Sequence, residues 1–208
     1  MAKRSYRQRC ALAQALDVVG ERWTLLLVRE LLTGPKRYKE LLAGLPGIGT
    51  NLLATRLKEL EATGLVAREG QGYRLTPRGE ELEDAVLALA RFGAPLLADA
   101  DPAGHWQASW NVIALKYSFR PERAQRVTGV LEYRVDGTHV QARVEDGAIE
   151  TSPDVRWDPD VVVQTDGATL LALSAGRVEV ADTEADGRLV VEGNRRLFRS
   201  SLRFFDVG

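Results

Sequence analysis

Polar residues in the first half of the chain have the types and the spacing that could read the bases of DNA. They are Thr50, Asn51, Thr55 and Lys58. At 3.6 residues per turn, the last three share one face of a helix, roughly opposite a leucine stripe of Leu53, Leu57 and Leu60. Small hydrogen-bonding side chains at the start of a helix, followed by cations, suit docking into the major groove. An ordinary solvated helix face is the alternative, and the neighbouring elements decide between the two.

Short helices and a β-ribbon are predicted around this helix and would position it. In chain order they are helices at 10–19, 23–32 and 38–43, a Pro-Gly turn at 46–49, the helix at 50–64, and β runs at 65–68 and 73–76 around a tip at 69–72. On the first two helices the expected inward side chains are Leu12, Ala15, Leu16, Val19, Trp23, Leu26, Leu27 and Leu31. This order predicts a winged helix-turn-helix, with the ribbon as the wing.

Cations in the same region could bind phosphates. Residues 1–98 hold 15 Lys and Arg against 11 Asp and Glu, a net charge of +4, whereas the remainder is at −5. We expect Thr50, Asn51 and Thr55 to approach base edges, and a group of cations to fix register on the backbone. The cations are Arg37, Arg56, Lys58, Arg68 and Arg74. Arg56, on the flank of its helix, could instead form an intramolecular ion pair. Lys3, Arg4, Arg7 and Arg9 form either a phosphate-binding arm or a solubilising tail.

Residues 10–97 resemble the HxlR-type transcriptional regulators of bacteria, which are related to the MarR group. The resemblance is carried by ALDVVGERWTLLLVRELLTGPKRYKEL, LPGIGTNLLATRLKELEATGLV and YRLTPRG. It implies a winged-helix repressor or activator that works as a homodimer. The wing departs from the family pattern, because its tip is only EGQG. We expect so short a tip to reach the phosphate backbone and not to enter deep into the minor groove.

A longer helix is predicted at 77–97, opened by Pro77 and early acidic residues. Its apolar face comprises Leu82, Ala85, Val86, Leu89, Phe92 and Leu96. We expect this face to form a dimer interface with the second copy and the first helix; packing onto the C-terminal half is the alternative. A two-fold dimer implies an inverted-repeat operator with half-sites about one helical turn apart.

The pattern changes after DADPAG, which predicts a DNA-binding and dimerisation domain at 1–98, a linker at 99–105 and a second domain at 106–208. Trp106, Trp110, Ile113 and Tyr117 form an aromatic helix face. Strands with alternating apolar residues follow, punctuated by Asp-Gly turns at 136–137 and 146–147. A helix at 195–205 is apolar on one side and carries arginines on the other. The whole chain is therefore predicted to be α+β.

The segment from residue 158 to 205 resembles the C-terminal part of sterol carrier protein 2 (SCP2) domains. The matching positions are Thr169, Leu170, Leu173, Gly176, Gly187, Leu189, Val191, Gly193 and Asn194. The resemblance implies an SCP2-like domain with helices over a five-stranded, mainly antiparallel sheet and an apolar tunnel for hydrophobic molecules. The candidate pocket residues are Trp110, Tyr117, Trp157, Phe198 and Phe205. For all of them except Tyr117, plain core packing is the alternative.

Other chemistry is sparse. Cys10, the only cysteine, follows Arg9, and some HxlR relatives sense oxidants through a cysteine at this position; a helix-start cysteine without a sensing role is the alternative. His105 and His139 show no metal-ligand spacing with it. Catalytic motifs, a membrane-length apolar run and a signal peptide are missing from the sequence. We therefore expect a cytoplasmic protein that is not an enzyme and needs no metal or cofactor.

Together these patterns predict a dimeric regulator that binds double-stranded DNA and responds to a small hydrophobic ligand, without a membrane partner. Two alternatives stay open. One is a thiol-based sensor of oxidants or electrophiles that acts through Cys10. The other is a carrier of lipids or other hydrophobic molecules whose winged helix contacts proteins instead of DNA; it should show no specific duplex binding, whereas a DNA reader should bind less tightly as salt rises.

Overall fold

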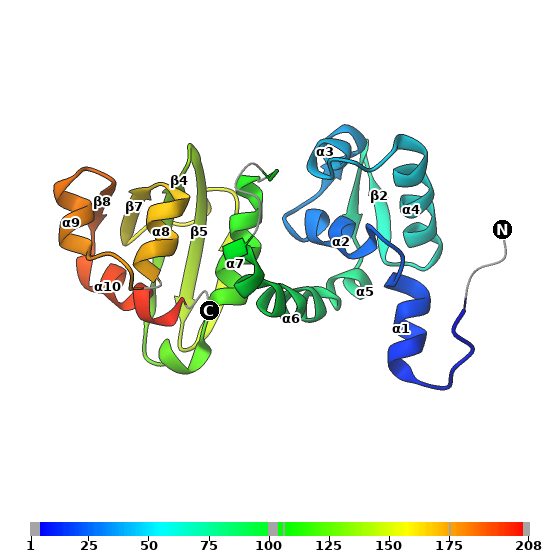
Figure 1. Cartoon of the computed structure of the whole chain (residues 1–208), viewed down its shortest axis with the longest axis horizontal. Coiled ribbons are helices and arrows are strands. Elements are labelled where there is room, and N and C mark those ends of the chain that lie inside the picture. Colours follow the sequence, from blue (N-terminus) through cyan, green and yellow to red (C-terminus); the bar gives the residue numbers. More distant parts are fainter. Residues whose placement is uncertain (1–4, 100–103, 106, 175, 206–208) are drawn as a thin grey trace. The chain divides into compact units, whose positions relative to one another are not determined.

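The computed structural model describes residues 5–99, 104–105, 107–174 and 176–205 (Figure 1). Its chain forms two compact units, Met1–Val86 and Leu87–Gly208. This division lies inside a helix and upstream of the predicted linker at 99–105, of which residues 100–103 lie outside the described part. The proposed domain limits at 98 and 106 therefore stay a prediction. No helix in the described part is both long and apolar enough to cross a membrane.

The N-terminal unit has the predicted winged helix-turn-helix order. Its elements are α1 (Ala11–Val19), α2 (Thr24–Leu32), β1 (Lys36–Arg37), α3 (Tyr38–Gly44), α4 (Thr50–Ala62), β2 (Val66–Glu69), β3 (Gly72–Leu75) and α5 (Pro77–Glu80). The wing is a tight hairpin, because Glu69 pairs with Gly72 across a two-residue turn. The strand β1 has no counterpart among the predicted elements, and it adds a third strand to the sheet by pairing Lys36 with Tyr73.

The core of this unit forms where the helices turn their apolar stripes inward. The leucine stripe of α4 is buried as predicted, and Leu27 and Leu41 are fully buried beside it. On α2 the buried arc is Leu27, Val28 and Leu31, so Leu26 falls at its rim and is exposed, against expectation.

The expected inward face of α1 is wrong for a single chain at every position except Val19. Ala13 and Val19 are buried, whereas Leu12 is 67% exposed and Leu16 is 37% exposed. Ala15 is exposed as well. These side chains lie on the part of α1 that no other element of its own chain covers in the described residues.

The predicted helix at 77–97 is broken into three pieces: α5, α6 (Glu83–Gly93) and a 3₁₀ helix at Ala94–Asp99. The break follows a tightened turn in which the Leu82 amide donates to the Gly79 carbonyl, three residues back. Thr76 caps α5 by accepting from the Gly79 amide. Gly79 must be glycine, because a Cβ there would lie 2.0 Å from the Leu65 carbonyl oxygen. Val86 and Leu87 are buried, whereas Leu89 and Phe92 are exposed.

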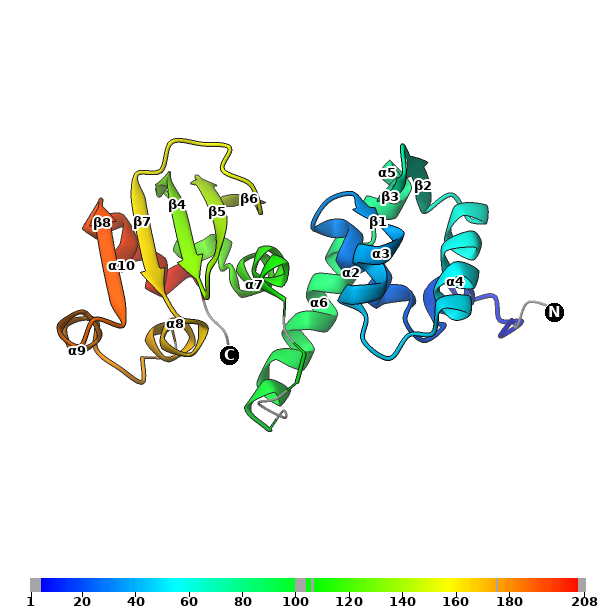
Figure 2. The ribbon, with the colours of Figure 1, turned by 90° about the horizontal axis from the view of Figure 1, so that it is seen from above.

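The C-terminal unit is built on a five-stranded sheet in the order β6-β5-β4-β7-β8 (Figure 2). The strands are β4 (Thr128–Val135), β5 (Thr138–Glu145), β6 (Ala148–Ser152), β7 (Val161–Thr165) and β8 (Leu189–Gly193). Only the β4–β7 pair is parallel, so the predicted mainly antiparallel sheet is confirmed. Its helices are α7 (Asn111–Ser118), α8 (Gly167–Ser174), α9 (Val180–Ala185) and α10 (Arg195–Phe204), with short 3₁₀ turns at Ala108–Trp110 and Pro121–Arg123.

Local sequence explains most of this unit. Asp136-Gly137 and Asp146-Gly147 all have positive φ and make the predicted two-residue hairpin turns. Asp166 caps α8 by accepting from the amide and hydroxyl of Thr169. One buried cluster joins the apolar faces of α7, α8 and α10 to one face of the sheet. The helix α9 was not predicted.

The other face of the sheet is partly covered by the segment between β6 and β7. Glu132 and Gln141, paired across β4 and β5, alternate with apolar residues as outward-facing strand positions do, yet both are buried. Gln141 accepts from the amides of Arg156 and Trp157 and donates to the Trp157 carbonyl and to Glu132. The crossing segment therefore hydrogen-bonds to this face through a polar residue.

Candidate nucleic-acid interface and ligand pocket

The exposed face of α4 carries the residues that the sequence proposed for base reading. Thr50, Asn51, Thr55 and Lys58 are all exposed, while the leucine stripe behind them is buried. Asn51 and Thr55 lie one turn apart and are linked, since the Thr55 hydroxyl donates to the Asn51 carbonyl at 2.9 Å. No ion pair is found for Lys58 in the described residues. The helix thus presents amide, hydroxyl and ammonium groups that a duplex could contact.

The start of α4 is held by the helix before it. The Tyr38 hydroxyl of α3 donates to the Thr50 carbonyl at 2.7 Å. Leu41 and Leu45 from the same helix-turn region are buried in the core with Leu53. These contacts fix α4 relative to α3, which is the geometry a helix-turn-helix needs.

Arg56 forms ion pairs within its own chain, which is the alternative that its position on the flank of the helix left open. Its guanidinium nitrogens lie 2.9 Å from a Glu21 oxygen and 2.6 Å from a Glu59 oxygen, and Nε donates to the Arg22 carbonyl at 3.4 Å. Its side chain is only 13% exposed. A cation engaged by two carboxylates has little to offer a phosphate, so the geometry favours a structural role.

The wing arginines remain accessible. Arg68 lies 3.3 Å from a Glu61 oxygen with its guanidinium over the Tyr73 ring, and its side chain is 70% exposed. Arg74 lies 3.5 Å from a Glu69 oxygen. Exposed pairs of this kind contribute about 0–1 kcal/mol, so a phosphate could replace the carboxylate.

Arg37 is brought to the wing by β1. Its amide donates to a Glu40 oxygen at the start of α3, and its side chain is exposed. With Lys36, Glu69 and Gln71 it lines a shallow groove beside the wing tip. Sequence reasoning missed this grouping, because a two-residue strand leaves no periodic signal.

The N-terminal arm is described from Ser5 onward, and Lys3 and Arg4 lie outside the described residues. The Ser5 hydroxyl and the Tyr6 amide donate to the Asp17 carboxylate on α1. Arg7 and Arg9 are exposed. Both interpretations of the arm stay open.

Cys10 occupies the N-cap position of α1 and its thiol is exposed. Hydrogen bonding from the backbone N–H of Ala13, and secondly of Leu12, lowers the pKa of this thiol. The start of the helix, and not the neighbouring Arg9, is the cause of this lowered pKa. No second cysteine exists in the chain.

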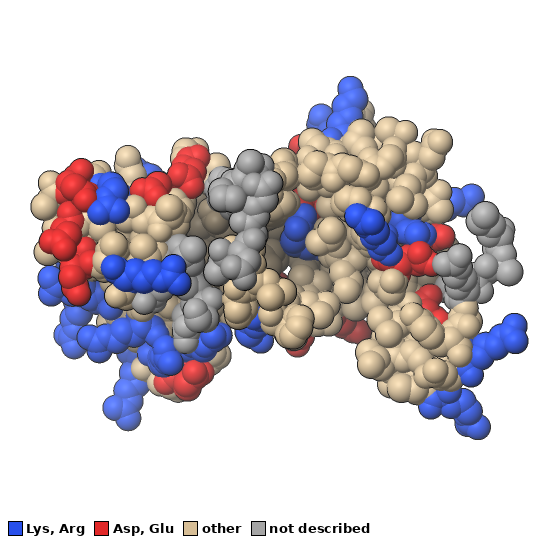
Figure 3. Space-filling view, viewed as in Figure 1, with Lys and Arg blue, Asp and Glu red and all other residues tan. Residues whose placement is uncertain are grey.

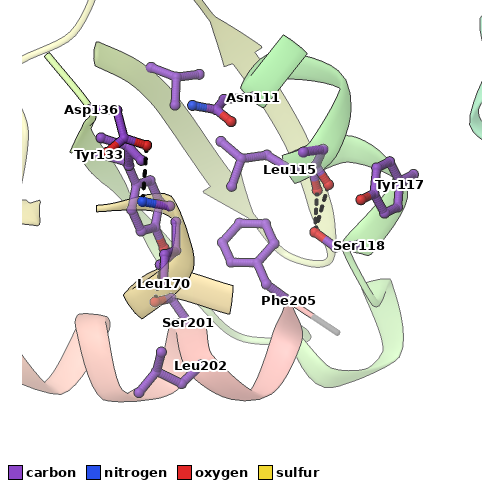
Figure 4. Close-up of a pocket in the computed structure, with 14 residues that line it drawn as sticks. Asn111, Leu115, Tyr117, Ser118, Tyr133, Asp136, Leu170, Ser201, Leu202 and Phe205 are labelled. Carbon is purple, nitrogen blue, oxygen red and sulfur yellow. Dashed lines mark hydrogen bonds between the residues drawn. The ribbon is translucent and has the colours of Figure 1, made fainter. Parts of the chain in front are cut away.

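A cavity of about 360 Å³ opens between the sheet and the helices of the C-terminal unit (Figure 4). Apolar side chains dominate its lining, including Leu115, Leu170, Leu202 and Phe205. The complete lining is Asn111, Ala114, Leu115, Tyr117, Ser118, Tyr133, Val135, Asp136, Val140, Gly167, Leu170, Ser201, Leu202 and Phe205. An apolar cavity with a few polar groups is typical of small-molecule sites.

Polar groups of the cavity are largely engaged by the protein. The Tyr133 hydroxyl donates to Ser201 Oγ at 3.0 Å, and Ser201 donates on to the Phe198 carbonyl. Burial raises the pKa of Tyr133 and that of Tyr117. Both phenols therefore stay neutral, so the cavity has no phenolate with which to attract a cation.

Two of the five candidate pocket residues, Tyr117 and Phe205, line this cavity. Phe198 is buried in the core behind it, and Trp110 packs edge-on against His105. Trp157 lies under the Arg143 guanidinium on the other face of the sheet. Trp106, on the same predicted aromatic face, lies outside the described residues. The lining residues that the sequence missed, such as Asn111 and Asp136, come from separate elements and share no local pattern.

Comparisons with known proteins find one family in the N-terminal half of the chain and another in the C-terminal half. Residues 18–100 match the HxlR-like helix-turn-helix family, and residues 113–205 match the SCP-2 sterol transfer family. An HTH-type transcriptional regulator of Synechocystis is 33% identical over 42% of this chain and 70% of its own length. Another HTH-type transcriptional regulator, from Mycobacterium bovis, is 39% identical over 40% of this chain. The match covers 56% of the length of that regulator.

A solved structure gives a similar coverage. The quinone-bound YodB from B. subtilis is 35% identical, with a TM-score of 0.37, over 42% of this chain and 94% of that protein. The names of the sequence relatives support a DNA-binding regulator. The chain therefore belongs to the HxlR-like helix-turn-helix family of transcriptional regulators and carries a C-terminal domain of the SCP-2 sterol transfer family.

Proposed function

We propose that this protein is a homodimeric regulator that binds an inverted-repeat operator with one α4 helix from each copy in the major groove. The observation that carries the proposal is the division of α4 into a buried leucine stripe and an exposed face of amide, hydroxyl and ammonium groups. In this arrangement Thr50, Asn51 and Thr55 contact base edges, because they lie on the first two turns of the helix.

Cations around α4 fix the register on the duplex. Lys58, Arg37, Arg68 and Arg74 are exposed and contact phosphates, whereas Arg56 ties α4 to the rest of the unit. The short wing places its arginines at the backbone. These contacts hold the protein on DNA without selecting a sequence.

Exposed apolar residues on α1 and α6 support the dimer. Leu12, Leu16, Leu89 and Phe92 are uncovered in a single chain. A second copy could bury these side chains, and apolar burial is the main favourable contribution to most protein association. Two-fold symmetry then pairs two identical α4 helices with two half-sites.

A small hydrophobic ligand in the C-terminal cavity would modulate DNA binding. A cavity of about 360 Å³ lined mainly by apolar groups supports such a ligand. The ligand can change DNA affinity only if it binds the DNA-bound and free states with different affinity. Because this coupling is reciprocal, a saturating operator must change ligand affinity by the same factor.

DNA selection followed by titration tests the proposed reading head. Operator sequences are recovered from random duplexes by selection, and binding is measured by fluorescence anisotropy at several salt concentrations. Asn51→Ala should weaken the operator but not random DNA, by about 1–3 kcal/mol for each lost base contact. Lys58→Ala should weaken both kinds of DNA and lower the salt slope by about 1.

Arg78→Ala is the matched control for lost charge, since Arg78 is exposed on α5 outside the reading face. Its binding should equal that of the unmodified protein. Failure to recover any duplex sequence, with binding that ignores salt, would refute DNA reading and favour the carrier with a protein-contacting winged helix.

Thiol sensing is a second candidate for the signal, favoured by the exposure and lowered pKa of Cys10. Any disulfide would have to join two copies or a small thiol, because the chain has one cysteine. Operator affinity is measured before and after treatment with diamide. If diamide changes the operator affinity of Cys10→Ser as much as that of the native protein, Cys10 is not the sensor. The cavity would then remain as the proposed site of the signal.

A further inference from the structure

The outer face of α10, in the acidic half of the chain, carries only positive charge. Arg195, Arg196, Arg199 and Arg203 are exposed along it, and the helix contains no acidic residue. Figure 3 shows Lys and Arg side chains gathered at the lower left, over the place that α10 has in Figure 1. Residues 99–208 carry a net charge of −5, so this gathering is not a by-product of a generally basic domain.

Three of these arginines have no carboxylate partner in the described residues. Arg195 is neutralised, because its guanidinium lies 2.6 Å from a Glu184 oxygen. Arg196, Arg199 and Arg203, which we name the arginine stripe, are exposed and line a shallow groove along the helix. Charges that are not used for folding are available to an external anion.

The arginine stripe matches the repeat of a polyanion. Its members are spaced by three and four residues, so at 1.5 Å per residue the stripe extends over about 10 Å on one helix face. That length spans two or three phosphates of a duplex backbone. Arginine suits such contacts, because its planar fork of donors binds phosphate oxygens bidentately.

We propose that the arginine stripe binds backbone phosphates of duplex DNA beyond those contacted by α4 and the wing. The inference rests on the proposed DNA-binding function. Because the stripe belongs to the same chain as the reading helix, DNA held by one is at high effective concentration for the other. The C-terminal unit then adds affinity without adding sequence preference.

The buried side of α10 argues against a lipid surface. Membrane-surface helices insert an apolar face next to their cations. On α10 the apolar face is Leu197, Phe198 and Phe204, and all three are packed into the core. Only arginines and partly buried side chains remain outside, so the stripe can attract a polyanion but has nothing to insert.

The test uses the full-length protein and a fluorescein-labelled random duplex of about 40 base pairs, roughly four helical turns. Anisotropy titrations over a range of salt concentrations give the slope of log affinity against log salt. The variant R196Q/R199Q/R203Q should lower this slope by about 2–3, since each lost phosphate contact removes about 0.9. The charge-conserving R196K/R199K/R203K should keep most of the slope, and circular dichroism confirms that each variant folds.

The matched control is R143Q/R177Q/R188Q, which removes the same charge from the same unit at exposed arginines outside α10. Equal slopes for this control and the stripe variant would overturn the inference. The lowered slope would then come from the loss of positive charge in general and not from the position of the arginines. An unchanged slope in the stripe variant, with the expected loss in Lys58→Ala, would overturn the inference and leave the proposed function standing. If the native protein does not bind the duplex at all, the proposed function itself is wrong.

Vesicles of phosphatidylglycerol and phosphatidylcholine provide the remaining arm of the test. The native protein should not sediment with them at the salt concentration where it binds the duplex. Sedimentation that is lost in the stripe variant, together with an unchanged duplex slope, would assign the stripe to anionic lipid and overturn the DNA assignment.

Discussion

Phe92 offers a direct test of the proposed dimer. It lies on α6 with 78% of its surface exposed in the single chain, more than any other large apolar residue described. A phenylalanine buries roughly 150–250 Å² when it is covered. Uncovering it on both copies therefore changes association strongly if α6 is the interface, and hardly at all if it is not.

The expected size follows from this burial. Full burial of such a side chain contributes about 1.5–3 kcal/mol. Taking about 2 kcal/mol for each copy, Phe92→Ala should cost the symmetric dimer about 4 kcal/mol, and the dissociation constant should rise about a thousandfold. Sedimentation equilibrium over a wide range of protein concentrations measures this constant.

Val190→Ala is the matched control, because Val190 is also exposed but lies on the edge strand β8. It should leave the dissociation constant unchanged. If Phe92→Ala dimerises within a factor of three of the native protein, α6 is not the interface. Leu12 and Leu16 of α1 would then have to carry the dimer without it.

Further predictions concern the elements that hold the two sites. Leu57→Ala, inside the α4 stripe, should destabilise the N-terminal unit by about 2–5 kcal/mol and lower its calorimetric transition. Tyr133→Phe removes the buried hydrogen bond to Ser201 and should cost about 1 kcal/mol in urea unfolding. Hydrogen bonds from the hydroxyl and amide of Thr169 lower the pKa of Asp166, so its stabilisation is present above the unfolded pKa of about 3.9 and is lost as pH falls through the folded value. Asp166→Ala should therefore lower the free energy of unfolding by about 1 kcal/mol near neutral pH. At strongly acidic pH the variant and the native protein should melt at nearly the same temperature.

The features that sequence predicted are those with local causes. The leucine stripe of α4 repeats at helical spacing, and two Asp-Gly pairs specify hairpin turns wherever strands flank them. The exposed polar residues of α4 follow from the stripe, because the opposite face of a helix is fixed once one face is buried. These features need no knowledge of distant residues.

The features that sequence missed depend on distant partners. Arg56 is tied to Glu21, which is 35 residues away, so its spacing on α4 could not reveal the pair. Glu132 and Gln141 alternate as exposed strand residues should, but a segment near Trp157 crosses and covers them. Likewise the cavity forms where three helices and a sheet meet, and no one of these elements shows it alone.

The helix α6 matters to any coupling between ligand and DNA, because it belongs to both units. Val86 near its start is part of the N-terminal core. Near its end Arg91 Nε donates to the Tyr117 carbonyl on α7, and Tyr117 lines the cavity with its neighbour Ser118. Within the C-terminal unit, a ligand that displaced α7 would therefore act on the end of α6 through this hydrogen bond. Phe92 follows Arg91 on the same helix, so under the proposed function a shift of α7 would act directly on the residue at which we expect the dimer contact.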